Sequence, residues 1–241
     1  DAKTVDFKTI AMVVEDTPHT KDIGDGAQEL AKGIGLNVVN VDIVPANTKD
    51  FAASIGKLKS LNADVVYVSA WIANATAFVK QAAELGLDPK EFHVAHATIG
   101  GPSFIKDVGE KLAEKITSES HEAPFTKGNV KMFRDLQKRA GMEDPMAYGW
   151  SSVRFIALEA IRNTIEKAGT LDKAKIMETV KGLRFEALHG DEYFQFGTKY
   201  LDKVLDGHGT KLVYPTQIQG GKVFVLWPED MATGKFQPRK K

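Results

Sequence analysis

The sequence contains no cysteine, which excludes disulfide bonds, thiolate nucleophiles and cysteine-ligated zinc. It also has no excess of either charge, because 32 lysines and arginines balance 32 aspartates and glutamates. A neutral chain has no overall field to attract nucleic acid or an anionic membrane. No apolar run approaches the length that is needed to cross a bilayer. Composition therefore predicts a soluble globular protein that does not bind nucleic acid.

Sequence signatures of enzymes are missing as well. There is no G-x-S-x-G nucleophile elbow and no Walker A sequence, and Gly24-Asp-Gly26 lies too far past its turn to be a good dinucleotide fingerprint. The six histidines give one close pair, His93 and His96, and residues three apart on a strand point to opposite faces. We therefore expect no catalytic residue, no metal site and no cofactor.

Short apolar runs, each followed by a turn and a helical pattern, dominate the first hundred residues. The first three are residues 10–14, 38–44 and 65–68, and further strands are expected at 92–97 and 116–120. This alternation predicts βαβ units, and hence an α/β fold with a parallel sheet that carries helices on both faces. Helices are expected from Asp22, after a cap at Thr48 or Asp50, and at about 74–85 with Asn74 as the obvious N-cap.

The later part of the chain has a different pattern. Residues 127–140, 147–168 and 172–183 are helical in character with no apolar strand between them, and residues 213–227 predict a hairpin about Gly220-Gly221. The apolar faces of the 147–168 and 172–183 helices need a sheet to pack on, whereas the first sheet already has its own covering helices. Part of the fold is therefore expected to lie outside this sequence.

The ends of the strands are the places to look for a binding site. Ligands of parallel sheets bind beyond the carboxyl ends of the strands. The candidate segments are therefore residues 15–20, 69–74 and 96–101.

Four stretches carry a resemblance to a known family. They are Lys8–Asp16 (KTIAMVVED), Thr48–Phe51 with Leu58–Tyr67, Gln81–Leu87, and Tyr214–Pro228 with Ala232–Gly234. In order and spacing they resemble the extracytoplasmic solute-binding receptors of branched-chain amino-acid-type ABC transporters. These leucine/isoleucine/valine-binding-like receptors are two-lobed periplasmic binding proteins of the type I fold.

The resemblance implies a division of the chain into lobes. Residues 1–121 and 205–241 would form the complete second lobe, and residues 122–204 the helical part of a first lobe whose strands are mostly absent. The start at Asp1 does not look like a signal peptide and is expected to be that of a mature or cut chain. A separate N-terminal fragment would then complete the first lobe. The alternative is a small rearranged domain that stands alone.

The resemblance also implies binding residues after the first and third strands. His19 or Thr20 takes the position of an aromatic residue that packs on the ligand in the family, although a solvated turn histidine is the plain alternative. Ser69-Ala70-Trp71 matches another contacting segment. A tryptophan directly after a strand is suited to stacking on a solute, so Trp71 is favoured as a ligand wall over core packing.

The fourth strand end departs from the family pattern. Amino-acid-binding members have an acidic residue at the position of His96 or Ala97, and no carboxylate lies between Phe92 and Lys106 here. A buried ammonium without a counter-charge is costly, so we expect a carboxylate or amide solute, with His96, His19 and Thr98 as donors. His96 as an ordinary strand-end histidine is the alternative. Trp150 resembles a residue beside the family's cleft, with core packing equally open.

The resulting hypothesis is a periplasmic, or extracellular and membrane-anchored, receptor that captures a small solute between two lobes and delivers it to an ABC permease. The solute would be an amino acid or an aromatic or aliphatic acid. The chain itself would not be an enzyme. The main alternative is a ligand-sensing module of the same fold in a receptor or regulator, and an enzyme on a flavodoxin-like sheet is the third possibility.

Overall fold

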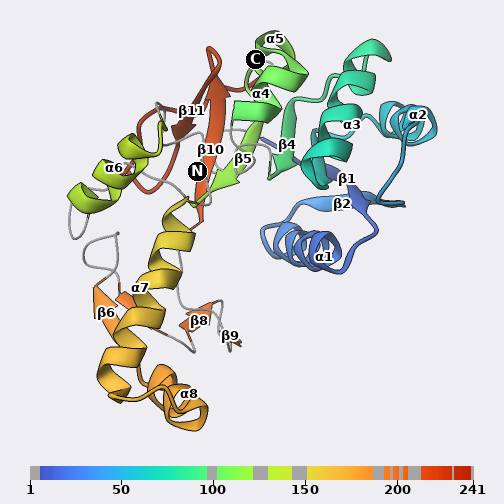
Figure 1. Cartoon of the computed structure of the whole chain (residues 1–241). Coiled ribbons are helices and arrows are strands. Elements are labelled where there is room, and N and C mark those ends of the chain that lie inside the picture. Colours follow the sequence, from blue (N-terminus) through green and yellow to red (C-terminus); the bar gives the residue numbers. More distant parts are fainter. Residues whose placement is uncertain are drawn as a thin grey trace. The chain divides into compact units, whose positions relative to one another are not determined.

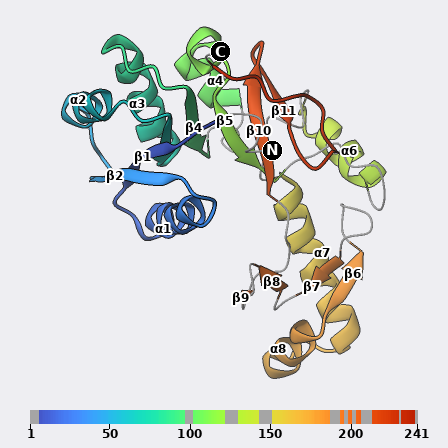
Figure 2. The same cartoon turned by 180° about the vertical axis from the view of Figure 1, so that it is seen from behind.

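The computed structural model describes residues 6–96, 102–121, 130–142, 151–186, 193–195, 198–200, 203–205, 213–229 and 231–239. The chain forms two compact units. Unit 1 consists of residues 1–120 and 215–241, and unit 2 of residues 121–214. Their elements can be followed in Figures 1 and 2. Whether unit 1 is the second lobe and unit 2 part of a first lobe stays a prediction.

Unit 1 is built on a seven-stranded sheet with the strand order β11-β10-β5-β4-β3-β1-β2. The pairs β1–β2, β1–β3, β3–β4 and β4–β5 are parallel, and the hairpin strands β10 and β11 are antiparallel. This confirms the predicted α/β fold with a parallel-dominated sheet. The bounds are β1 (Thr9–Glu15), β2 (Asn37–Val44), β3 (Val65–Ser69), β4 (Glu91–Ala95), β5 (Thr117–Ser120), β10 (Tyr214–Gln219) and β11 (Lys222–Val225).

Helices bury both faces of this sheet. On β1, Ala11 and Val13 join the large core that contains residues of α2 (Ala52–Leu61), α3 (Ile72–Glu84), α4 (Pro102–Val108) and α5 (Glu110–Ala113). Met12 and Val14 point the other way, into a smaller core with Ala31 of α1 (Pro18–Gly33). A strand that is apolar at every position is expected where both faces are covered, which explains the continuous apolar run.

Two helices begin earlier than the sequence pattern indicates. Helix α1 starts at Pro18 and not at Asp22, because Thr17 is its N-cap and a proline suits the first helical position. Helix α3 starts at Ile72 with Trp71 at the N-cap position, so the predicted capping role of Asn74 is wrong. The Asn74 amide instead donates to the carbonyl oxygens of Pro45 and Ala46, at 3.3 and 3.0 Å.

The fourth strand is shorter than predicted. It ends at Ala95, and His96 follows with a φ of 67°, in the left-handed region that non-glycine residues rarely adopt. Further along the chain, Gly109, whose φ is 90°, separates α4 from α5. A backbone that turns this sharply after β4 changes the direction in which its next side chain projects.

The predicted hairpin is confirmed. Gln219 of β10 pairs with Lys222 of β11, so the turn contains only Gly220 and Gly221. Both glycines have positive φ, 55° and 73°, as a two-residue type I′ turn requires. The hairpin joins the sheet beside β5, where the backbone N–H of Ile218 donates to the carbonyl of Ile116 at 3.0 Å.

Unit 2 is mainly helical in its described residues. It contains α6 (Val130–Arg139), α7 (Ser151–Ala168) and α8 (Lys173–Lys181), with short strands β6 (Arg184–Glu186), β7 (Tyr193–Gln195), β8 (Thr198–Tyr200) and β9 (Lys203–Leu205). Phe133, Ile156 and Leu183 are buried, whereas Leu158 and Ile161 of α7 are exposed. The two short strand pairs, β6–β7 and β8–β9, are antiparallel, were not predicted, and form sheets separate from that of unit 1.

Candidate functional site

Three aromatic side chains from separate strand ends of unit 1 lie together. His19 follows β1, Trp71 follows β3 and His96 follows β4. The ring centroids are 5.1 Å apart for His19 and Trp71, 5.4 Å for Trp71 and His96, and 5.2 Å for His19 and His96. His19 is exposed, Trp71 is 44% exposed and His96 is 4% exposed. We call these three residues the ring cluster.

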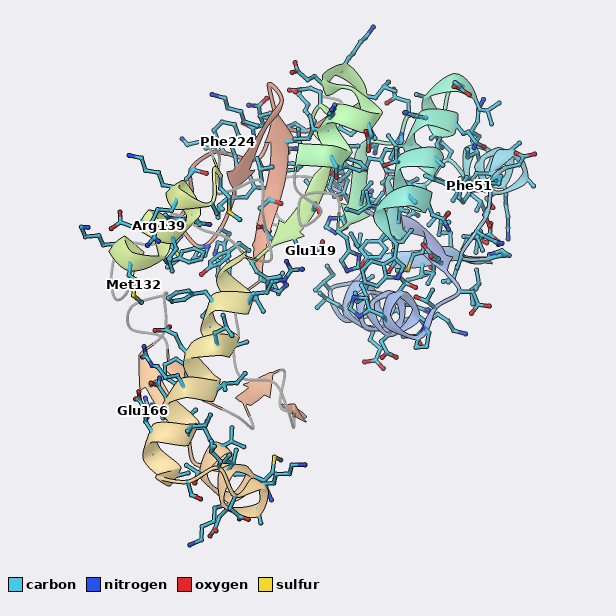
Figure 3. All side chains as sticks on the ribbon, viewed as in Figure 1. Phe51, Glu119, Met132, Arg139, Glu166 and Phe224 are labelled. Atoms are coloured by element: carbon cyan, nitrogen blue, oxygen red, sulfur yellow. The ribbon has the colours of Figure 1, made fainter. Side chains whose placement is uncertain are left out.

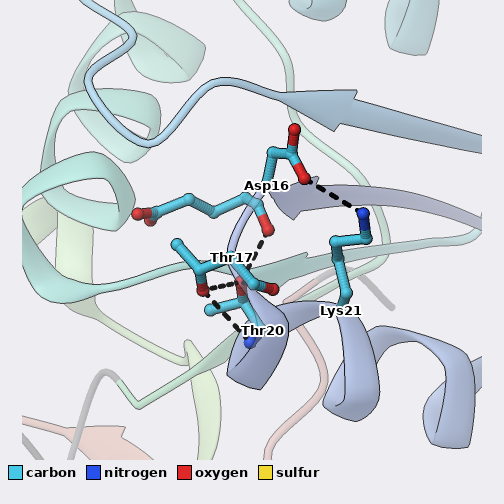
Figure 4. Close-up of polar contacts among 5 residues, drawn as sticks. Asp16, Thr17, Thr20 and Lys21 are labelled. Atoms are coloured by element: carbon cyan, nitrogen blue, oxygen red, sulfur yellow. Dashed lines mark hydrogen bonds and ion pairs between the residues drawn. The ribbon is translucent and has the colours of Figure 1, made fainter.

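The first turn of α1 holds His19. The Thr17 side chain caps the helix by accepting from the Thr20 backbone N–H, and the Thr20 hydroxyl donates to the Glu15 carbonyl at 2.6 Å (Figure 4). The same figure shows the ion pair of Asp16 and Lys21, 3.1 Å apart. These contacts fix the first helical turn directly against the end of β1, and so determine where the His19 ring projects.

Glu15, the last residue of β1, holds the Trp71 backbone. Its Oε2 atom accepts a hydrogen bond from the Trp71 N–H at 2.8 Å. Glu15 is only 2% exposed, and this burial raises its pKa although the hydrogen bonds from Trp71 and Asn74 act in the opposite direction. A buried carboxyl on β1 therefore anchors the start of α3, where the tryptophan ring emerges.

Glu119 of β5 holds His96 in a comparable way. Its Oε1 atom accepts from the His96 backbone N–H at 2.8 Å, and its Oε2 atom lies 3.4 Å from Nε2 of His93. Figure 3 labels Glu119 on its strand. The left-handed backbone of His96 costs about 1 kcal/mol or more, which a charge-assisted hydrogen bond helps to offset.

The charge of Glu119 is stabilised by its neighbours. Burial alone would raise its pKa, but the hydrogen bond from His93, the attraction to His93 and His96 when they are protonated, and the backbone hydrogen bond from His96 outweigh burial, so the pKa is lowered. His93 is itself held by stacking on Tyr67, with ring centroids 5.0 Å apart and an interplanar angle of 3°. An ionised carboxylate on β5 therefore holds the backbone of His96 in the ring cluster.

A track of polar contacts continues from Glu119 along β4 and β5. Nδ1 of His93 lies 3.1 Å from the Thr117 hydroxyl, which donates to Oε1 of Glu91 at 2.7 Å. Glu91 begins β4, so the track runs from the start of that strand to the ring cluster beyond its end. This side of β4 is polar, whereas Phe92 and Val94 on the opposite side belong to the large apolar core.

The structure brings together some of the predicted site residues and not others. His19, Trp71 and His96 gather, as the strand-end rule predicts. Thr20, Ser69 and Ala70 are buried beside them, and the Ser69 hydroxyl donates to the Thr20 carbonyl at 2.8 Å, so these residues support the backbone. Ala97, Thr98 and Trp150 lie outside the described residues. The roles of all nine in solute binding stay predictions.

Sequence reasoning missed two carboxylates of the site. Glu15 falls inside a candidate segment but was given no role, and Glu119 lies on β5, 23 positions after His96. The Ser-Glu-Ser context of Glu119 carries no local signal for either contact. Among the residues that the structure describes, no three histidine, aspartate or glutamate side chains form a group that could hold a metal ion.

Comparison with known proteins places this arrangement in a family. Residues 2–222 match the family model described as a periplasmic binding protein. The chain belongs to this family. The matched proteins are named as binding proteins, in agreement with the expectation that the chain is not an enzyme. Within the described part of the chain, no helix combines the length and the apolar character that a membrane span requires.

The relatives in this family are distant in sequence. The Leu/Ile/Val-binding protein homolog 7 of Brucella abortus is 22% identical over 236 residues, which cover 95% of this chain and 57% of the relative. The leucine-, isoleucine-, valine-, threonine- and alanine-binding protein of Pseudomonas aeruginosa is 24% identical, over 76% of this chain and 48% of its own length. The chain thus spans about half the length of these relatives.

Solved structures of the same fold agree with the architecture. The leucine binding protein LivK from Thermotoga maritima superimposes with a TM-score of 0.80 at 19% identity, covering 95% of this chain and 63% of that protein. LivJ from Streptococcus pneumoniae, solved with isoleucine, gives a TM-score of 0.70 at 18% identity, over 92% of this chain and 60% of its own. The type I periplasmic binding protein fold is therefore established for the chain.

Proposed function

We propose that the chain serves in an extracytoplasmic receptor of an ABC importer and captures a small solute at the ring cluster. The observation that carries the proposal is the meeting of His19, Trp71 and His96 at the carboxyl ends of three neighbouring parallel strands. Aromatic faces stack on apolar or planar groups, and imidazole N–H groups donate to oxygen. The site lies where ligands of such sheets bind.

The solute is proposed to carry a carboxylate or an amide and no ammonium group. Within the described part of the chain, the carboxylates of Glu15 and Glu119 contact the ring cluster, and they accept hydrogen bonds from the backbone of Trp71 and His96. They hold the site in shape, and its exposed groups are the His19 imidazole and the Trp71 indole, beside the buried imidazole of His96. The relatives include a protein named as binding leucine, isoleucine, valine, threonine and alanine, and a homolog of Leu/Ile/Val-binding proteins. A branched aliphatic acid or an aromatic acid fits both lines of support.

Matched solute pairs test this proposal. Phenylacetate and isocaproate should bind the protein at least tenfold more tightly than phenylglycine and leucine, which add only the α-ammonium group, because a buried ammonium there lacks a dedicated counter-charge. Isothermal titration calorimetry measures each affinity. Tighter binding of leucine than of isocaproate would contradict the proposal.

A variant pair assigns the binding to the ring cluster. Trp71→Ala should weaken phenylacetate binding about tenfold or more, because the stacking face is lost. Trp227→Ala is the matched control, since Trp227 is also exposed, at 63%, but follows the hairpin and lies outside the cluster. Equal effects of the two substitutions would place the solute elsewhere.

We further propose that the apolar side of α7 and α8 packs against a first-lobe segment of the whole protein. The receptor assembled in this way would deliver its solute from the periplasm to a membrane permease. Support comes from four large apolar side chains that are more than half exposed: Leu158 67%, Ile161 58%, Leu171 75% and Met177 59%. The relatives are also longer than this chain. Native mass spectra of the purified protein should show an additional bound polypeptide that is lost on denaturation. A protein that remains a monomer without any partner, and whose unit 2 unfolds in a cooperative transition, would overturn this proposal.

A further inference from the structure

The two histidines of the ring cluster share one hydrogen bond. Nε2 of His19 lies 3.3 Å from Nε2 of His96, and in such a contact one ring presents an N–H and the other a lone pair. The two facing nitrogens therefore hold a single proton between them. An arriving carboxylate changes this requirement, because each Nε2 atom can donate to a carboxylate oxygen only if it carries its own hydrogen.

The second hydrogen has two possible sources. The accepting ring can exchange its Nδ1 hydrogen for one on Nε2, which leaves it neutral, or it can bind a proton from solvent and become an imidazolium. The surrounding charges decide between them. An imidazolium is favoured where an anion lies close by and disfavoured where the nearby charges are positive.

The charges around His96 favour the imidazolium. Glu119 of β5 contacts the His96 backbone at 2.8 Å, and its lowered pKa keeps it ionised. The second neighbour of Glu119 is His93 of β4, whose Nε2 atom lies 3.4 Å from Oε2 of Glu119. Glu15 of β1, which accepts from the Trp71 backbone N–H, adds a second carboxyl group, and burial raises the pKa of this group.

The charges near His19 are balanced. On α1 and the turn before it, Asp16 and Lys21 form an exposed ion pair with each other. No other charged side chain of the described part of the chain is recorded in contact with the His19 ring, whose two ring partners are Trp71 and His96. Among these groups, Glu119 supplies the negative charge that lies directly against His96.

We propose that the site takes up one proton with each carboxylate solute, and that this proton is held on the His19–His96 pair with Glu119 as its counter-charge. The inference rests on the proposed function, since it requires a carboxylate solute at the ring cluster. In balance, one carboxylate and one proton enter: the buffer acid loses the proton, one imidazole nitrogen gains an N–H bond, and the bound carboxylate and the imidazolium together carry no net charge. A neutral amide solute enters without a proton.

Calorimetry in buffers of different ionisation enthalpy measures the proton directly. Phenylacetate, and in parallel isocaproate, is titrated into the protein near neutral pH in phosphate and in Tris. The observed heats should differ by the amount that corresponds to about one proton released by the buffer per solute bound. Phenylacetamide is the neutral control and should give no difference. Above the pH at which the histidines lose their charge, the affinity for phenylacetate should fall up to tenfold for each pH unit.

Two substitutions test the assigned groups. His19→Gln keeps a hydrogen-bond donor but cannot titrate, so the variant should bind phenylacetate more weakly and lose most of the proton uptake. Glu119→Gln keeps an acceptor for the His96 N–H but removes the negative charge, so proton uptake should move to lower pH. Thermal unfolding of both variants identifies any loss of fold, and Glu84→Gln on the exposed end of α3 is a control for the change of charge.

The outcomes separate this inference from the proposed function. Phenylacetate that binds with the same heat in both buffers, and with constant affinity from about pH 6 to about pH 9, overturns the proton uptake and leaves the solute site intact. Failure of both acids to bind at any pH overturns the two proposals together. Normal proton uptake by His19→Gln would remove the histidine pair from the explanation.

Discussion

Phe78→Ala is expected to lower the free energy of unfolding by about 3–5 kcal/mol, the usual cost of removing a fully buried phenylalanine. Phe78 lies on the inner side of α3 with no exposed surface. Its ring meets Phe51 edge-on at 5.4 Å and 84°, and Phe92 at 6.0 Å and 72°. These rings join α2, α3 and β4, so a cavity at this place is lined by three separate elements and cannot readily collapse.

Chemical denaturation of the purified chain measures this loss. Leu85→Ala is the matched control on the same segment, because Leu85 is 42% exposed at the end of α3 and should cost well under 1 kcal/mol. A Phe78→Leu variant should fall between the two, since it fills part of the cavity. A loss below 1 kcal/mol for Phe78→Ala would mean that the three rings do not pack as described.

Glu91→Gln is expected to stabilise the protein at about pH 8 by roughly 3 kcal/mol and to have little effect near pH 4. Glu91 is 5% exposed at the start of β4. Its Oε1 atom accepts from Thr117, whereas its Oε2 atom is buried and meets no hydrogen-bond donor within the described residues. Burial raises its pKa to about 7, against the opposing effects of Thr117 and of the charges of His93 and Arg239.

The direction of the pH dependence follows from the raised pKa. Between the unfolded value of 4.5 and the folded value of about 7, the folded protein binds more protons than the unfolded chain. This contribution to stability is therefore fully present below pH 4.5, falls as the pH rises, and is lost above about pH 7. Glutamine resembles the protonated acid at every pH, so the variant keeps the contribution.

Unfolding at several pH values, with the difference between variant and wild type as the measured quantity, removes the effects of other titrating groups. Glu84→Gln on the exposed surface of α3 should give a small difference that does not change with pH. A Glu91→Gln effect of equal size near pH 4 and near pH 8 would show that the Glu91 carboxyl does not change its charge over this range.

Much of the fold was predictable because burial on both faces leaves a strong local signal. The β-branched runs of β1, β2 and β3 were placed within one or two residues, and Gly220-Gly221 predicted the hairpin. Helix starts were harder. The pattern predicts the first helix from Asp22, although a threonine cap followed by a proline begins it at Thr17-Pro18. It also gives Asn74 a capping role, although the Asn74 amide reaches across to the loop after β2.

The ring cluster was predictable for a different reason. The strand-end rule places His19, Trp71 and His96 at one edge of the sheet without any knowledge of their side-chain contacts. The supporting carboxylates were not predictable, because a hydrogen bond between Glu119 and the His96 backbone depends on the order of strands and on the left-handed turn after β4. Neither feature has a signature in the residues around Glu119.

The position of β10 in the sheet has a consequence for synthesis on the ribosome. Strand β5 is complete by Ser120, but its neighbour β10 begins only at Tyr214, after all of unit 2. Chains grow from the N-terminus at several residues per second, so a nascent chain carries β1 to β5 for several seconds with β5 unpaired on the side that β10 later occupies. Bare edges pair with other strands. Pairing of β10 with β5, marked by the Ile218–Ile116 hydrogen bond, thus ends the exposure of this edge. A chaperone that shields β5 would act before this hydrogen bond forms.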